Sequence, residues 1–277
     1  MKIRYLVPLL IILPLQGLAQ NKGSDEFDQI LKSYEAHSDQ FMNLQGCGNI
    51  LDGPAFIMKI GQNTTLDALL FMSESDEMEM GNDAFKEIQK REKILTSHWA
   101  KDQVQSILNN MVRYVDRKGI KYQIHIIDSE EINAFATVGG NIFLTSSIID
   151  FVDSFDELAF IIGHEVSHID KEHTVRKQKK LLLASAFADF MDMQHLTEIA
   201  VNIELMLNAP FDQIDEYEAD EYGVSLAKRA GYDAKKFDSF FEKLSKYQDR
   251  NILNKLLSTH PFAADRKACI DGYIKTK

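Results

Sequence analysis

Apolar side chains recur three and four residues apart in several stretches of the chain, a spacing that places them on one face of a helix. The longest stretch runs from about Asp83 to Lys118, with apolar positions at Phe85, Ile88, Ile94, Leu95, Val104, Ile107, Leu108, Met111 and Val115. Others cover residues 156–169 and the stripe of Phe237, Phe240, Phe241, Leu244 and Tyr247. The pattern predicts helices that pack their apolar faces into a common core.

A different pattern occupies residues 121–145. Three runs rich in β-branched and aromatic residues, 121–127, 133–138 and 142–145, have strand character. Gly139-Gly140-Asn141 separates the second run from the third and signals a turn. We therefore predict a small antiparallel sheet that lies next to the helix over residues 156–169.

That helix contains the motif His164-Glu165-x-x-His168. Residues four apart lie on one face of a helix, so the two imidazoles can bind one metal ion. Zinc accepts neutral histidine nitrogens at about 2.0–2.1 Å, and a glutamate beside the first histidine can act as a general base. The motif predicts a zinc hydrolase in which Glu165 activates water.

A catalytic zinc site of this kind needs a third protein ligand. His173 follows His168 by five residues, whereas the extended motif places a third histidine six residues on, after a glycine. Lys171 occupies the position of that glycine, so we expect the helix to continue and His173 to be a structural or surface histidine.

The better candidate for the third ligand lies in the acidic run of residues 215–223. Glu216 and Asp220 are four apart and share one face of a predicted helix. The small or apolar residues Ala219, Gly223 and Leu226 indicate tight packing against another helix. We predict that Glu216 binds the metal and that Asp220 accepts a hydrogen bond from a ligand histidine.

His-Glu-x-x-His followed by Glu216-x-x-Ala219-Asp220 resembles the zinc metalloendopeptidases of the HtpX and CAAX prenyl endopeptidase type. Three further segments match that family in order and spacing across about residues 76 to 270: Met78–Gly81; Asn133–Ala136 with Gly139, Gly140 and Ile142; and Ser258-Thr259-His260-Pro261 with Arg266. The resemblance implies an α+β, mostly helical zincin-like (gluzincin) metallopeptidase.

The resemblance also implies roles for individual residues. His164, His168 and Glu216 would bind one zinc ion per chain, with Glu165 as the catalytic base. His260 would lie near the metal and either stabilise the transition state or cap the zinc at rest; the alternative is a loop histidine before a proline. Apart from the resemblance, we expect Arg266 to pin the loop of His260 by an ion pair to the acidic helix, at Asp220; the alternative is a solvated surface arginine.

The run that begins at Asn133 carries our expectation for substrate binding. An edge strand can bind an extended peptide as an additional strand. We expect residues 133–138, with Asn133, Ala134, Phe135 and Ala136, or residues 141–145 to bind the substrate backbone. The alternative is an ordinary packed hairpin, and pairing of a run on both sides would exclude it as the binding strand.

Composition limits the class of partner. The chain has 277 residues, of which 45% are hydrophobic and 26% charged, and a formal charge of −11. A phosphate-binding protein needs a basic surface, so we expect polypeptide substrates and no nucleic acid. The apolar stretch Leu181–Phe190 is too short to span a bilayer, so we expect a helix buried against the core.

The N-terminus predicts export. Lys2 and Arg4 precede an apolar stretch from Leu6 to Leu15, and Ala19 ends a small-residue cleavage signal. We predict a signal peptide over residues 1–19, with a retained membrane anchor as the alternative, and no transmembrane span after cleavage. The expected location is the periplasm, with secretion or N-terminal anchoring as alternatives.

Residues 20–75 form an N-terminal extension of helix and loop to which we assign no role. Its helical spacing at Phe27, Ile30, Leu31 and Tyr34 predicts a first helix. The zinc metallopeptidase domain would cover residues 76–277. The only cysteines, Cys47 and Cys269, would form a disulfide in an oxidising compartment or remain two buried thiols.

Taken together, the motifs predict a zinc-dependent endopeptidase that hydrolyses envelope or exported proteins, with a place in protein quality control implied by the resemblance alone. The competing hypothesis is a catalytically idle, metal-stabilised binding or chaperone-like protein. Glu165 favours the enzyme, because a purely structural zinc site has no need of a base beside it.

Overall fold

The computed structural model describes residues 63, 67, 70–190, 211–247, 254–260 and 264–275. The predicted signal peptide, the predicted first helix near residues 27–34 and Cys47 lie outside the described residues, as does nearly all of the extension over residues 20–75. These predictions therefore stay as stated.

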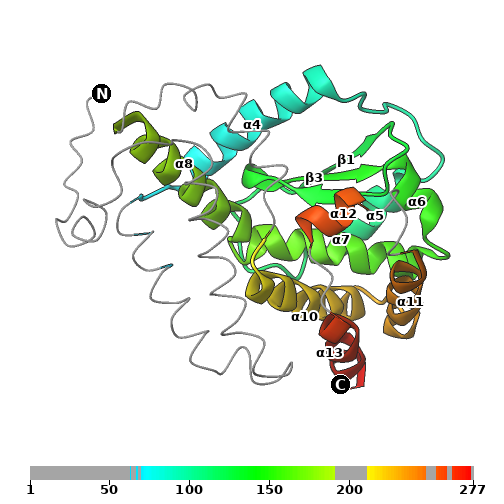
Figure 1. The fold of residues 1–277 in the computed structure, drawn as a ribbon. Helices are drawn as coiled ribbons and strands as arrows, with labels where there is room; N and C mark the ends of the chain where they lie inside the picture. The colour runs from blue at the N-terminus through cyan, green and yellow to red at the C-terminus, as the bar shows by residue number, and fades with distance from the viewer. Residues whose placement is uncertain are drawn as a thin grey trace. The chain divides into compact units, whose positions relative to one another are not determined.

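The described chain is mostly helical, with one small sheet, which confirms the predicted α+β class (Figure 1). Its strands are β1 (Gln123–Ile127), β2 (Ala134–Ala136) and β3 (Asn141–Thr145). Its helices are α4 (Glu74–Arg91), α5 (Lys101–Met111), α6 (Ser146–Phe151), α7 (Phe155–Asp170), α8 (His173–Phe190), α10 (Gln213–Arg229), α11 (Phe237–Tyr247), α12 (Asn254–Thr259) and α13 (Ala264–Lys275).

The single helical stretch expected between Asp83 and Lys118 is wrong, because two helices share it. α4 begins at Glu74, where Ser73 and Asp76 form a capping box. Between α4 and α5 the chain is not helical, and Ile94 there forms a β-bridge with Ile127 at the end of β1. Tertiary pairing with the sheet therefore overrides the helical spacing of this segment.

The sheet has the strand order β1-β3-β2 and is mixed. β2 and β3 pair antiparallel, as predicted, but β1 pairs parallel to β3. Gly139 and Gly140 adopt φ angles of 81° and 91°, which lets the chain reverse tightly into the β2–β3 hairpin. Packing decides whether β1 pairs with β2 or with β3, and it pairs with β3. The prediction of a wholly antiparallel sheet is therefore wrong for β1.

Helices cover both faces of the sheet. Phe143 in the central strand packs with Ile88 of α4 on one face. Ile142 and Leu144 face the main core, to which α5 and α7 contribute. All five residues of β3 are consequently buried, as is usual for a strand covered on both faces. Figure 1 shows α7 between the sheet and α10.

α7 and α10 approach each other closely at two glycines. A Cβ atom on Gly163 would lie 2.8 Å from the carbonyl oxygen of Gly223. A Cβ atom on Gly223 would lie 2.8 Å from the backbone nitrogen of His164. The tight helix packing predicted for the acidic run is thus confirmed, and it brings the motif of α7 against the carboxylates of α10.

Two further apolar segments are helical as predicted. The α11 stripe is buried at Phe237, Phe240, Phe241 and Leu244. The expected helix at Leu181–Phe190 is the second half of α8, although Leu183 is 41% exposed and so departs from the expected burial. Among the described helices, none is long and apolar enough to cross a membrane.

Cys269 on α13 is buried and disulfide-bonded. Free thiols are absent from the part of the chain that the structure describes. This observation favours the oxidised alternative for Cys269. Cys47, the other cysteine of the sequence, is not among the described residues.

Candidate metal centre

Three elements place five polar side chains together in the interior. α7 carries His164, Glu165 and His168, α10 carries Glu216, and His260 follows the last turn of α12. None of the five is more than 6% exposed. Ser154 caps the N-terminus of α7 and Asp212 that of α10, so each helix starts at a sequence-encoded signal ahead of the site.

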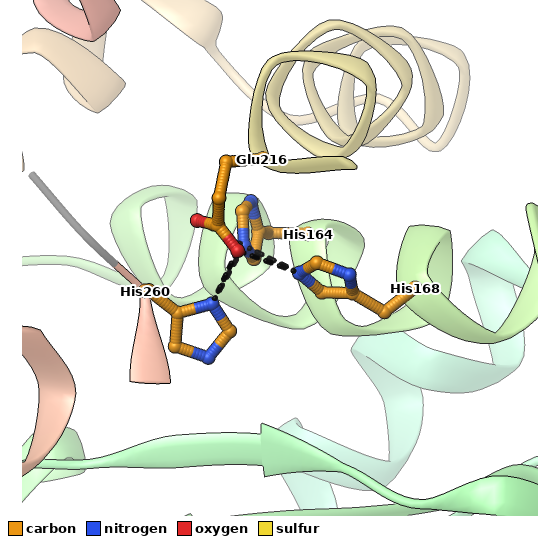
Figure 2. Close-up of side chains that lie close together, drawn as sticks. All are labelled: His164, His168, Glu216 and His260. Carbon is orange, nitrogen blue, oxygen red and sulfur yellow. Dashed lines mark hydrogen bonds and ion pairs between the residues drawn. The ribbon is translucent and has the colours of Figure 1, made fainter. Parts of the chain in front are cut away.

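Four of these side chains converge on one point (Figure 2). The Nε2 atoms of His164 and His168 are 3.0 Å apart, and His168 Nε2 lies 3.4 Å from Glu216 Oε1. His260 Nδ1 lies 3.1 Å from Glu216 Oε1 and 3.3 Å from His164 Nε2. Tetrahedral ligands at zinc–nitrogen distances of about 2.0–2.1 Å stand roughly 3.3 Å from one another.

The hydrogen bonds of His164 show that this point suits a cation. Its Nδ1 lies 2.9 Å from Asp220 Oδ1. An ionised carboxylate only accepts, so Nδ1 carries the proton and Nε2 presents a lone pair to the cluster. That lone pair and the Glu216 oxygen face the same point, and two or three imidazoles with one carboxylate form a donor set that zinc accepts.

Arg266 balances the negative charge beside the cluster. Its Nε and second terminal nitrogen donate to the two oxygens of Asp220 at 2.7 and 2.8 Å, and its first terminal nitrogen lies 2.7 Å from Glu216 Oε2. Burial alone would raise the pKa of Glu216, but His260 and Arg266 outweigh burial and hold that pKa well below its ordinary value. Glu216 is therefore ionised and able to bind a metal.

Glu165 experiences the opposite balance. Burial raises the pKa of its carboxyl, although His260 and His164 oppose the shift. Its Oε1 lies 3.6 Å from His260 Nε2, and its Oε2 is buried with no hydrogen-bond partner among the described residues. A carboxyl with a raised pKa is a better proton acceptor, as a general base requires.

A cavity of about 40 Å³ adjoins Glu165 and His260. Its wall is largely apolar and aromatic and includes Ala134, Phe160, Ile161, Phe240, Phe241, Leu244 and Leu256. The α11 stripe thus serves both the core and this wall. The cavity therefore places apolar and aromatic surface beside the base and the histidine next to it.

The sheet settles part of the expectation for the substrate strand. β3 is paired on both sides, so residues 141–145 are excluded as the peptide-binding strand. β2 lies at the edge, and within the described residues it pairs with β3 alone. Of its predicted contributors, Ala134 lines the cavity, whereas Phe135 stacks on Phe143 at 4.9 Å between ring centroids.

The prediction that the motif helix continues past Lys171 is wrong. α7 ends at Asp170, Glu172 adopts a left-handed φ of 61°, and α8 begins at His173. The prediction assumed that a helix end here would need a glycine. Glu172 instead adopts the left-handed conformation that glycine usually takes at a helix end. His173 is fully buried, outside the four-residue cluster but 3.0 Å from His168.

Sequence reasoning also missed Phe211, which stacks on His168 at 3.8 Å between ring centroids. Its backbone nitrogen donates to Thr259, next to His260, at 3.2 Å. Phe211 precedes the N-cap of α10 and has no periodic pattern around it, so the sequence offered no signal for this contact. It closes one side of the histidine cluster.

Comparison with known proteins gives one family and several distant relatives. Residues 98–274 match the profile of Peptidase family M48. The Beta-barrel assembly-enhancing protease of Escherichia coli (strain K12) is 27% identical over 216 residues, 71% of this chain and 43% of that protein. The Mitochondrial metalloendopeptidase OMA1 of Arabidopsis thaliana is 29% identical over 197 residues, 69% and 40% respectively.

The Metalloendopeptidase OMA1, mitochondrial, of Bos taurus is 28% identical over 175 residues, 56% of this chain and 33% of that protein. The chain therefore spans less than half the length of these relatives. The family match includes every residue of the buried cluster and its carboxylate and arginine partners, namely His164, Glu165, His168, Glu216, Asp220, His260 and Arg266.

Proposed function

The chain belongs to peptidase family M48, and from that membership and its buried cluster we propose that it is a zinc-dependent endopeptidase. The observation that carries the proposal is the convergence of His164, His168 and Glu216 beside Glu165. A structural metal site has no use for a buried, unpaired carboxylate oxygen next to its ligands, whereas a hydrolase does.

We assign His164, His168 and Glu216 as the zinc ligands. Zinc held by these residues would polarise the scissile carbonyl and would lower the pKa of water towards about 7. Asp220 holds His164 in the tautomer that a ligand needs, and Arg266 fixes the carboxylates of Asp220 and Glu216. This donor set distinguishes the proposal from a site for calcium or magnesium, which prefer oxygen ligands.

Glu165 accepts the proton of the attacking water and passes it to the leaving amine. Its raised pKa suits both steps, because the same carboxyl must first accept and then donate. His260 has its pKa raised by Glu216 and Glu165 against the effect of burial, so it can donate towards a developing oxyanion. His260 also belongs to the four side chains whose ligand atoms converge, which supports the capping role at rest once its Nδ1 has lost its proton.

We place the substrate backbone along the open edge of β2. Within the described residues no strand pairs with the outer side of β2, so its main-chain groups there can bind an extended peptide. Asn133 Oδ1 is buried with no hydrogen-bond partner among the described residues, so it is a further acceptor beside that edge. Ala134 lines the apolar cavity next to Glu165, which would receive an apolar substrate side chain.

For the physiological setting we propose quality control of proteins in the envelope, with the mature chain in the periplasm. The names of the relatives, a beta-barrel assembly-enhancing protease and two metalloendopeptidases, support proteolysis of polypeptides. The signal peptide over residues 1–19 remains a sequence-based prediction, as does the narrower resemblance to HtpX and CAAX prenyl endopeptidases. The competing proposal is an idle, metal-stabilised binding protein.

Replacing Glu165 tests the mechanism. Glu165→Gln should reduce cleavage of casein by the purified mature chain at least about 100-fold, because general-base catalysis contributes about 10²–10⁴-fold. Zinc content, measured by elemental analysis, should be unchanged, since Glu165 is not a proposed ligand. The exposed Glu79→Gln is the matched control and should cleave like the wild type.

Equal cleavage by the Glu165→Gln and wild-type proteins would refute the assigned base. Glu216→Ala separates binding from catalysis, because it should lower both zinc affinity and cleavage. A wild-type chain that holds zinc tightly but cleaves neither casein nor envelope proteins would favour the idle binding protein.

A further inference from the structure

His173 connects the metal helix to α10. It is the first residue of α8, fully buried, and its Nδ1 lies 3.0 Å from the Nδ1 of His168. Its other nitrogen, Nε2, lies 3.1 Å from Glu218 Oε2 and 3.2 Å from Asp215 Oδ1, both on α10. The side chain therefore contacts a proposed zinc ligand at one nitrogen and two carboxylates at the other.

The carboxylates determine where the proton of His173 resides. Ionised carboxylates only accept hydrogen bonds, so Nε2 of a neutral His173 is the nitrogen that carries the proton. Its Nδ1 is then an acceptor, and the hydrogen bond to His168 requires the proton of His168 to be on Nδ1. The Nε2 of His168 is left with a free lone pair, directed at His164 Nε2 and Glu216 Oε1.

The two proposed histidine ligands thus reach a carboxylate by different routes. His164 contacts Asp220 directly, whereas His168 reaches Glu218 and Asp215 through the ring of His173. The left-handed turn at Glu172 makes this possible, because it separates α7 from α8 and so places His173 at the start of α8.

We propose that His173 is a positioning residue that holds His168 in the tautomer and orientation a zinc ligand needs. The inference rests on the proposed zinc site. His173, Asp215 and Glu218 also lie close enough together to bind a metal ion of their own. Arg176, however, forms an ion pair with Asp215 at 3.3 Å and already places a cation there. The geometry therefore favours a chain of hydrogen bonds from the carboxylates through His173 to His168 over a second metal site.

Two substitutions separate the halves of this chain of hydrogen bonds. In His173→Asn the short amide keeps an acceptor near the position of Nδ1 and loses the carboxylates. In His173→Gln the longer amide keeps a donor near the position of Nε2 and loses His168. If His173 only joined α8 to α10, the Gln variant should preserve zinc affinity at least as well as the Asn variant. If His173 positions His168, the Asn variant should preserve zinc affinity better.

The experiment measures the zinc dissociation constant of the full mature chain by competition with a chromogenic chelator. His173→Gln should weaken zinc binding by about 10–100-fold, as loss of such partners does at other metal sites. His173→Asn should bind zinc more tightly than His173→Gln. Thermal unfolding of the metal-free proteins provides the structural comparison, and there the Asn variant should be no more stable than the Gln variant.

Nitrogen-15 NMR of the histidine rings in the wild-type protein tests the same inference without a variant. The zinc-loaded protein should show His173 protonated at Nε2 and His168 protonated at Nδ1. His173 protonated at Nδ1, or zinc affinity in the Gln variant equal to or above that in the Asn variant, would overturn the inference alone. A wild-type chain that binds no zinc would overturn the proposed function as well.

Discussion

At the scale of single residues, the candidate site depends on one buried cation. Arg266 is 5% exposed and contacts both Asp220 and Glu216, which are fully buried. Burial alone would raise the pKa of Asp220, but Arg266 outweighs burial and lowers it. The planar guanidinium reaches three carboxylate oxygens at once, which a single ammonium group cannot match.

Arg266→Lys should therefore destabilise the protein although it conserves charge. A lysine can pair closely with only one of the two carboxylates, so the other is left buried without its partner. Removing one partner of a buried ion pair lowers the free energy of unfolding by about 3–5 kcal/mol. Urea unfolding of the metal-free protein measures the loss. The exposed Arg113→Lys should stay within about 0.5 kcal/mol of the wild type, and an equal effect in both variants would contradict the role of Arg266.

At the scale of elements, the site is formed where α7 crosses α10. The crossing depends on Gly163 and Gly223, since a Cβ on either would clash with the backbone of the other helix. It places Asp220 and Glu216 opposite His164. The proposed ligands His164 and Glu216, which are 52 residues apart in sequence, therefore contact each other directly from two packed helices. Packing of small residues thus determines the geometry of a polar site.

Gly223→Ala should push the two helices apart. The added methyl group would meet the His164 backbone nitrogen at 2.8 Å, and overpacking of a core costs about 1–3 kcal/mol. Both thermal stability and zinc affinity should fall. Gly272→Ala on α13 is the matched control, because its Cβ would meet no atom within 4 Å and alanine favours a helix by about 1 kcal/mol.

The same element scale shows why some helix boundaries could be predicted. Acidic residues at the start of α7 and the acidic run of α10 are local signals, and both helices begin close to them. The non-helical segment between α4 and α5 and the turn at Glu172 could not be predicted, because each depends on contacts with distant residues. Ile94 pairs with Ile127, and Glu172 lies 3.7 Å from Arg117.

At the scale of the whole molecule, Asp170 joins segments that are far apart in sequence. Its carboxylate accepts hydrogen bonds from the backbone nitrogens of Asp116 and Arg117 and from the hydroxyls of Tyr122 and Tyr222. Burial alone would raise the pKa of Asp170, but these hydrogen bonds outweigh burial and hold the pKa below 3.8. One carboxylate therefore ties α7 to the segment before β1 and to α10.

The stability contributed by Asp170 should depend on pH. The unfolded carboxyl titrates near 3.8 and the folded one lower, so its contribution is present above pH 3.8 and lost as pH falls through the folded pKa. Asp170→Asn should cost about 1.5–3 kcal/mol at neutral pH. Unfolding of the metal-free proteins should show this difference narrowing in acid; a difference that does not change with pH would contradict the assignment.

The sequence by itself determined which residues are candidates for the chemistry of this protein. The spacing of His164, Glu165 and His168, the Glu216–Asp220 pair and the small residues of α10 identified the helices and the candidate ligands, because these patterns repeat within a few residues of chain. The same periodicity predicted helices and a small sheet, and the resemblance to a known family implied the fold class. Such signals are local, so they survive in a single sequence without any knowledge of contacts.

Only the tertiary structure decided the rest. It placed β1 parallel to β3, ended α7 at Asp170, and brought Phe211 and His173 against His168. Each outcome depends on which surfaces pack together, and packing energy is a property of pairs of segments that the spacing along one segment does not encode. His173 shows the difference most clearly, since its distance along the chain argued against the contact that the fold creates.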